Sequence, residues 1–260
     1  MKNLKILFIG NSFAQDTMEH TPSIARVLGI ESIKFGLLYV GGCSIDMHYA
    51  HAMGNLDVYK YYTSSGDAWH CQPDFRISDA LSSEDWDWVA IQHGTHGRSR
   101  YTSPECYERL TPLIEYVKER VPAHTKIAFN LTWMGEATHQ HHEIVSYHGD
   151  TAEMRRRLIE VTRATVAVNP LVDLLIPTGT AIENARTSRI GLLTRDCYHL
   201  SMDKGRFIAG LTFLAAITGL SIDNISSAPV GGVDEYALAV AIESVKNALK
   251  SPFEITPSAL

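Results

Sequence analysis

The sequence has few cysteines, no long apolar run and no excess of positive charge. Its four cysteines stand far apart among 260 residues and include no Cys-x-x-Cys pair. This spacing does not match a zinc ribbon, and it favours reduced thiols over disulfides. The longest apolar stretches, Leu4 to Ile9 and Ile208 to Ile217, are shorter than the roughly 20 apolar residues that span a bilayer. The sequence therefore predicts no membrane-spanning segment and no membrane partner.

The formal net charge of -6 leaves no positive field that would attract a phosphate backbone. We therefore expect no nucleic-acid partner. Lys2 and Lys5 precede apolar residues, but the apolar run stops after Ile9, so the core of a signal peptide does not form. The sequence as it stands predicts a cytoplasmic protein, and a periplasmic or secreted one if a leader has been removed.

Short apolar runs alternate with longer amphipathic stretches, as in a parallel sheet with helices between its strands. The expected strands cover residues 5–9, 32–40, 86–92, 126–132 and 171–176. The expected helices cover residues 16–28, opened by a capping box of Asp16 and Glu19, then 103–121, opened by Ser103 and Pro104, then 151–168, 204–218 and 234–249. We expect one domain over residues 1–260 with a flavodoxin-like, three-layer α/β/α fold and a mostly parallel five-stranded sheet. Residues 54–83 are expected to be an irregular insertion near a binding site.

Ligands of open parallel sheets bind beyond the carboxyl ends of the strands. The informative segments at or near these ends are Gly10-Asn11-Ser12-Phe13, Gly41-Gly42-Cys43-Ser44, Gln92-His93-Gly94-Thr95-His96 and, before the penultimate helix, Asp196-Cys197-Tyr198-His199. A serine hydroxyl becomes a good nucleophile when an imidazole takes its proton and a carboxylate orients that imidazole. Asp196 and His199 are three residues apart and can lie side by side, so the sequence predicts a triad of Ser12, His199 and Asp196.

These segments resemble the conserved blocks of the SGNH (GDSL-like) hydrolases. Gly10-Asn11-Ser12 resembles their first block, Gly42 the glycine of the second, and Asp196-x-x-His199 the fifth. The arrangement also resembles an uncharacterised bacterial SGNH-like family with a Gly-Asn-Ser-Phe first block. The resemblance implies a serine hydrolase whose oxyanion hole includes the backbone N–H groups of Ser12 and Gly42.

The third block departs from the SGNH pattern, in which an asparagine supplies another oxyanion donor. Gly94-Thr95-His96 stands at this place, and Gln92 ends the preceding strand. Either Gln92 or His96 could be the third donor. Gln92 is favoured, because an uncharged amide donates a hydrogen bond without needing a particular protonation state.

Five further residues are candidates for substrate binding, because they lie near the predicted strand ends: Asn11, His48, His93, Arg98 and Trp133. Arg98, together with Arg100, could hold a substrate carboxylate, and Trp133 could stack on a sugar ring. The resemblance implies hydrolysis of a small O-acyl ester, commonly acetyl, on a carbohydrate or similar polyol, without a metal or organic cofactor.

Two alternatives remain open at the level of the sequence. One is a carbohydrate-binding protein that keeps the fold without turnover. The other is a metal-dependent hydrolase that uses His139, His141, His142 and Glu143.

Overall fold

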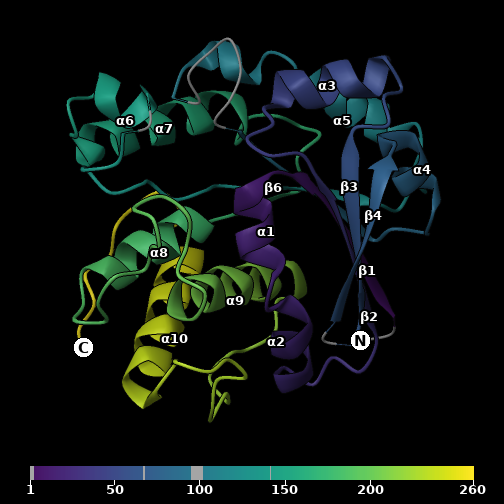
Figure 1. Cartoon of the computed structure of the whole chain (residues 1–260). Coiled ribbons are helices and arrows are strands. Elements are labelled where there is room, and N and C mark those ends of the chain that lie inside the picture. The colour runs from purple at the N-terminus through teal and green to yellow at the C-terminus, as the bar shows by residue number, and fades with distance from the viewer. Residues whose placement is uncertain (1–2, 67, 95–101, 141) are drawn as a thin grey trace. The chain divides into compact units, whose positions relative to one another are not determined.

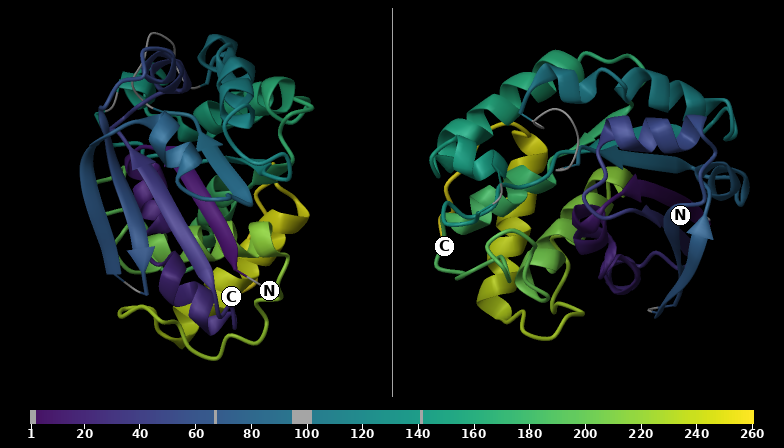
Figure 2. Two further views of the ribbon diagram at one scale, coloured as in Figure 1. Left: turned by 90° about the vertical axis from the view of Figure 1, so that its right-hand side faces the viewer. Right: turned by 45° about the horizontal axis from the view of Figure 1, so that its top comes forward.

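The chain forms an α/β structure (Figures 1 and 2). The strands of its described residues make a seven-stranded, mostly parallel sheet. The computed structural model describes residues 3–66, 68–94, 102–140 and 142–260. The strands are β1 (Leu4–Gly10), β2 (Ile33–Tyr39), β3 (Tyr59–Ser65), β4 (Ala68–Phe75), β5 (Trp88–Gln92), β6 (Lys126–Asn130) and β7 (Leu174–Ile176). Their order is β4-β3-β2-β1-β5-β6-β7. The predicted fold class is confirmed, with seven strands in place of five.

Strand β1 is the centre of the sheet and pairs in parallel with β2 on one side and β5 on the other. Its residues from Ile6 to Gly10 are all buried, and Ile6 lies opposite Phe35 and Trp88. A run that is apolar on both faces is typical of a strand covered on both sides. The order β2-β1-β5-β6-β7 is that of a flavodoxin-like sheet, in which the strand order reverses at β1. The carboxyl end of β1 is therefore where a ligand site is expected.

Residues 54–83 are more regular than expected. They contain the antiparallel strands β3 and β4, which extend the sheet beyond β2, and a short helix, α4 (Ile77–Ser82). Tyr59 and Tyr61 are buried whereas Lys60 between them is exposed, and the ring of Tyr61 stacks on Phe75 at 4.5 Å. The alternation of buried and exposed residues is a strand pattern. The expectation of an irregular insertion was wrong, because aromatic residues in a polar segment supply the buried face.

The helices begin and end near the predicted positions in the second half of the chain. They are α1 (Ser12–Met18), α2 (Thr21–Val27), α3 (Ile45–Met53), α4, α5 (Leu110–Lys118), α6 (His142–Ser146), α7 (Thr151–Thr165), α8 (Thr178–Arg186), α9 (Lys204–Thr218) and α10 (Glu235–Lys250), with one 3-10 helix, η1 (Pro104–Tyr107). Helix α9 matches its predicted range and ends at Gly219, whose φ of 66° is the left-handed conformation of a helix C-cap. Helices α3, α4, α6 and α8 were not predicted.

Two predicted helix starts were wrong. Asp16 does not open a helix, because it lies inside α1, where its side chain is fully buried, and α2 begins only at Thr21. Ser103 precedes only η1, its side chain makes no capping hydrogen bond, and α5 begins at Leu110. In both places the sequence has a residue that is typical of a helix N-cap, but in the structure this residue does not cap the α-helix that was expected to follow it.

The chain divides into two compact units, each assembled from three segments. The first contains Met1–Gln15, Glu31–Phe129 and Glu160–Leu175, and the second contains Asp16–Ile30, Asn130–Ile159 and Ile176–Leu260. In the first unit α3 packs against α5, and α4 contacts α3 and β2. In the second unit α9 packs against α2, α8 and α10, and the ribbon shows α8, α9 and α10 grouped together (Figure 1).

Candidate functional site

Asn11 links three loops at the carboxyl ends of the central strands. Its amide nitrogen donates hydrogen bonds to the carbonyl oxygens of Cys43 (3.0 Å) and His93 (3.4 Å). Its amide oxygen accepts from the N–H of Phe13 (3.0 Å) and from the side chain of Gln92 (2.8 Å). Because Asn11 is 1% exposed and its polar atoms are used in these bonds, it holds the strand ends together. The burial favours this role over the direct substrate contact expected from the sequence.

Gln92 is also fully buried, and its amide nitrogen points at Asn11. This contact favours a supporting role over that of third oxyanion donor. His96, the other candidate for that role, and Arg98 and Arg100 lie outside the described residues.

Ser12 is the first residue of α1 and directly follows Asn11. Asn11 and Phe13 on either side are buried, whereas Ser12 is partly exposed. The turn from β1 to α1 therefore presents the side chain of Ser12 at the end of the central strand, as a nucleophile requires.

Glycines allow the neighbouring loops to approach each other closely. Gly42 has a φ of 64°, a left-handed conformation that favours glycine. A Cβ atom on Gly94 would lie 1.9 Å from the carbonyl oxygen of Cys43, so no other residue fits there without moving the backbone. The N–H of Gly42 remains a proposed oxyanion donor.

His48 and His93 are core residues of the first unit. Both side chains are fully buried, and burial lowers the pKa of each to about 3, with a further contribution from His51 at His48. The Nδ1 atom of His48 lies 2.9 Å from the hydroxyl oxygen of Tyr59, and the two rings stack. Both imidazoles are therefore neutral, and the expectation that they line a substrate site was wrong because the fold buries them.

Asp196 and His199 form a hydrogen-bonded pair in the second unit. The carboxylate Oδ2 of Asp196 lies 2.7 Å from Nδ1 of His199. Its Oδ1 accepts from the backbone N–H groups of His199 (2.6 Å) and Tyr198 (3.1 Å). The turn itself thus orients the carboxylate, and the carboxylate orients the imidazole with Nε2 as the remaining ring nitrogen.

The contacts of Asp196 also decide its charge. Partial burial alone would raise the pKa of this carboxyl group, but hydrogen bonds from the His199 ring and from the two backbone N–H groups outweigh that effect and lower the pKa. Asp196 is therefore ionised at neutral pH.

Trp133 supports the same turn from the core of the second unit. It is 1% exposed, and its indole N–H donates to the carbonyl oxygen of Tyr198 at 2.9 Å. The backbone N–H of Glu136 donates to the carbonyl oxygen of Cys197 at 2.6 Å. Trp133 offers no open face for a sugar, and the expected stacking role is corrected to one of support.

Three charged residues that the sequence did not single out for the site form a network beside the turn: Asp16 accepts from the N–H of Leu200 and from Arg195, and Arg206 bonds to Asp16. Their hydrogen bonds join positions 179 to 190 residues apart, so no local pattern could have revealed them. Because Asp16 was interpreted as part of a capping box, its hydrogen bonds to distant residues were not expected.

The histidine-rich tract shows no metal site in the part of the chain that the structure describes. His139 stacks on Tyr198 with ring centroids 4.7 Å apart. His141 and the side chains of His142 and Glu143 lie outside the part that the structure describes. Among the described side chains, no group of three or more His, Cys, Asp or Glu residues could hold a metal ion. All four cysteines are free thiols. No helix in the described ranges has the length and apolar character needed to cross a membrane.

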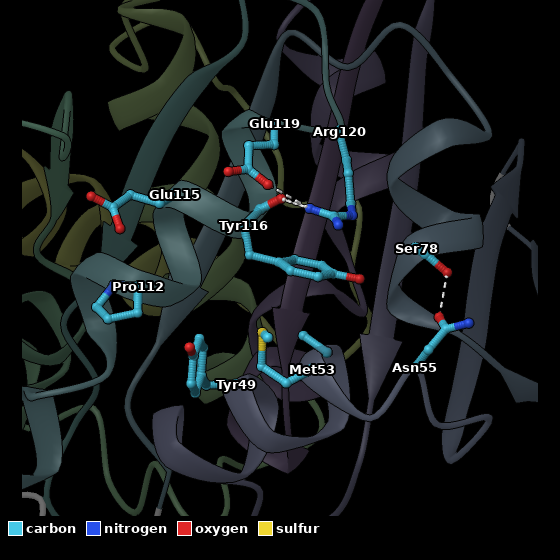
Figure 3. A pocket seen from close by; sticks show the side chains of 10 residues that line it. Tyr49, Met53, Asn55, Ser78, Pro112, Glu115, Tyr116, Glu119 and Arg120 are labelled. Atoms are coloured by element: carbon cyan, nitrogen blue, oxygen red, sulfur yellow. Dashed lines mark hydrogen bonds and ion pairs between the residues drawn. The ribbon is translucent and has the colours of Figure 1, made fainter.

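A pocket of about 540 Å³ opens in the first unit, between α3, α4 and α5 (Figure 3). Tyr49 and Met53 line it from α3, and Tyr116 and Arg120 line it from α5 and the residues that follow it. The guanidinium of Arg120 stacks over the ring of Tyr116 and donates to its carbonyl oxygen. None of the expected site residues that the structure describes lines this pocket.

Comparisons with known proteins agree with the α/β fold. A crystal structure of a DUF4886 family protein from Bacteroides uniformis has a TM-score of 0.91 and 28% identity, covering 98% of each chain. A variant of an acetyl xylan esterase from Geobacillus stearothermophilus has a TM-score of 0.50 and 17% identity, covering 84% of this chain and 97% of that one. A comparison with curated proteins gives no match. Residues 5–247 match the family described as "Domain of unknown function (DUF4886)", and the chain belongs to that family.

Proposed function

We propose that the protein is an SGNH-type serine esterase with Ser12 as nucleophile, His199 as base and Asp196 as the orienting carboxylate. The observation that carries the proposal is the contact of 2.7 Å between Asp196 and Nδ1 of His199. A carboxylate in this position selects the tautomer in which Nε2 can accept a proton. Ser12 supports the proposal from the other unit, because it is a partly exposed serine at the carboxyl end of the central strand.

In the proposed reaction, His199 removes the hydroxyl proton of Ser12 as the serine oxygen attacks the ester carbonyl. The proton then passes from His199 to the leaving alcohol, and an acyl group remains on Ser12. Water activated by His199 releases the acid and restores the serine. Asp196 remains ionised and stabilises the imidazolium in both steps.

We propose that the backbone N–H groups of Ser12 and Gly42 bind the oxyanion of the tetrahedral intermediates. The left-handed conformation of Gly42 supports this role, because it turns the backbone sharply after β2 without a side chain in the way. Asn11 supports the two loops, because its amide nitrogen donates to the carbonyl oxygen of Cys43 and its amide oxygen accepts from Gln92. Removing one oxyanion donor typically costs about 10²- to 10³-fold in rate.

The proposed substrate is a small O-acyl ester, with acetyl on a carbohydrate as the first choice. This part rests on the SGNH resemblance of the sequence and on the acetyl xylan esterase with a similar fold. A screen of acetylated sugars and polysaccharides would define the alcohol.

The direct test compares the wild-type protein with Ser12→Ala. We expect a fluorophosphonate probe to label the wild type at Ser12, and we expect the variant to lose both labelling and hydrolysis of p-nitrophenyl acetate. Ser78→Ala is a matched control, because Ser78 is a partly exposed serine in α4. Full activity in Ser12→Ala would contradict the proposal, and activity that depends on an added metal ion would select the metal-dependent alternative.

A further inference from the structure

The Asp196–His199 pair lies in a tight turn that is closed at its base. Thr194 and Leu200 form an antiparallel β-bridge, and the N–H of Arg195 donates to the carbonyl oxygen of His199 at 2.9 Å. Cys197 inside the turn has a φ of 64°. A non-glycine residue in this conformation is strained and persists only where the surrounding structure holds it. The turn therefore requires contacts from outside itself.

A single buried carboxylate supplies such contacts on both flanks of the Asp-x-x-His sequence. Oδ2 of Asp16 accepts from the backbone N–H of Leu200 at 2.8 Å, and Oδ1 accepts from Nη1 of Arg195 at 2.9 Å. Leu200 directly follows His199, and Arg195 directly precedes Asp196. Asp16 is fully buried, so water does not compete for these hydrogen bonds.

Arg206 from α9 balances the charge of the carboxylate. Its Nε and Nη2 atoms lie 2.9 Å and 2.8 Å from Oδ1 of Asp16, and its side chain is also buried. Charge-assisted hydrogen bonds of this kind are strong and directional, and in a dry site they hold their geometry. Two guanidinium groups and one backbone N–H thus converge on Asp16.

Asp16 also belongs to the helix that begins with Ser12. Residues four apart in an α-helix lie one above the other on the same face, and α1 runs from Ser12 to Met18. One short helix therefore carries both the proposed nucleophile and the carboxylate that is hydrogen-bonded to the two flanks of the Asp196–His199 turn.

We propose that Asp16 is a positioning residue of the esterase: with Arg195 and Arg206, it anchors the turn that carries Asp196 and His199 to helix α1. The inference rests on the proposed function and deepens it. A misplacement of about 1 Å can cost on the order of 10²-fold in rate, so loss of this anchor acts on kcat while Asp196, His199 and Ser12 all remain.

Two variants test the inference, Asp16→Asn and Arg195→Gln. The second keeps the assay possible if the first does not fold, because the Arg195 side chain is 34% exposed and Arg206 still pairs with Asp16. We expect kcat for p-nitrophenyl acetate to fall about 10- to 100-fold with little change in KM. We expect the rate of fluorophosphonate labelling at Ser12 to fall by a similar factor. Hydrogen exchange of the peptide covering residues 194–200 should become faster.

Asn184→Ala is the control for a loss of stability that does not touch the turn. The side chain of Asn184 is buried in the second unit, where its amide nitrogen donates to the carbonyl oxygen of Ser244 and its amide oxygen accepts from the N–H of Thr256. Its removal should lower the unfolding midpoint while leaving kcat and exchange of the 194–200 peptide unchanged.

The outcomes separate this inference from the proposed function. A wild-type protein without activity that depends on Ser12 contradicts the proposed function. An active wild type with unchanged kcat in both folded variants contradicts the positioning role alone. Unchanged exchange of the 194–200 peptide contradicts it as well, because the anchor would then not hold the turn.

Discussion

The two oxygens of the Asp196 carboxylate have different partners, and this division makes the residue difficult to replace. Oδ1 accepts two backbone N–H groups of the turn, and Oδ2 faces the imidazole of His199. In Asp196→Asn, the amide oxygen can still accept the backbone bonds, but the amide N–H would face Nδ1. That contact selects the wrong tautomer of His199.

We therefore expect Asp196→Asn to fold normally and to lose about 10⁴-fold in kcat. Steady-state hydrolysis of p-nitrophenyl acetate, together with circular dichroism, measures both quantities. A kcat within tenfold of the wild type would show that Asp196 does not orient the base.

The buried histidines predict how stability depends on pH. Burial lowers the pKa of His48 and His93 to about 3, whereas an unfolded histidine titrates near 6.5. Between these values the unfolded chain binds protons that the folded chain does not. The stability that the two neutral histidines contribute is therefore fully present above about pH 6.5, and it is lost progressively as the pH falls towards 3. Each histidine contributes a slope of up to about 1.4 kcal/mol per pH unit.

Urea unfolding between pH 7.5 and 4.5 measures this slope. We expect His48→Phe to reduce the slope, whatever its effect on stability at pH 7.5. His70→Gln should leave the slope unchanged, because His70 is exposed. Equal slopes in the wild type and in His48→Phe would show that His48 is not buried in its neutral form.

At the scale of an element, the end of α9 depends on one glycine. Gly219 adopts a φ of 66°, and no atom lies within 4 Å of the position that a Cβ would take. The cost of Gly219→Ala is therefore backbone strain without a clash, and we expect a loss of about 1 kcal/mol in the free energy of unfolding. Urea denaturation measures it.

Gly231→Ala is the matched control for this change. Gly231 is exposed, also has no atom within 4 Å of a Cβ position, and is not among the glycines with positive φ. Its substitution should be close to neutral. Equal losses in the two variants would indicate that the backbone conformation is not the cause.

At the scale of the whole molecule, the two units share secondary-structure elements. Helix α1 passes from the first unit to the second after Gln15, and α7 passes back after Ile159. The hydrogen bonds of a helix form cooperatively, so neither unit can lose its structure without affecting a helix of the other. The expectation of one domain remains a prediction.

We predict that the chain unfolds in a single transition. Trp69, Trp86 and Trp88, which are three of the four tryptophans, belong to the first unit, whereas α8, α9 and α10 belong to the second. Tryptophan fluorescence and far-UV circular dichroism should therefore give the same midpoint in urea. Two separate midpoints would show that the units unfold independently.

The sequence by itself determined the features that depend on local geometry. Three features could be predicted from neighbouring residues alone. They are the buried run of β1, the glycine at the end of α9 and the contact between Asp196 and His199, which are three residues apart. The structure shows all three where they were expected. The alternation around Tyr59 and Tyr61 also indicates a strand. Strands β3 and β4 were not predicted because the segment as a whole is polar.

Only the tertiary structure decided which polar residues are buried and with what they pair. Asn11, His48 and Trp133 proved to be core residues, and Asp16 proved to bind residues that follow it by 179 to 190 positions. The physical reason is that spacing along the chain fixes only the neighbours within a turn or a strand. Burial and long-range ion pairs depend on which distant segments meet, and this is a property of the packed chain as a whole.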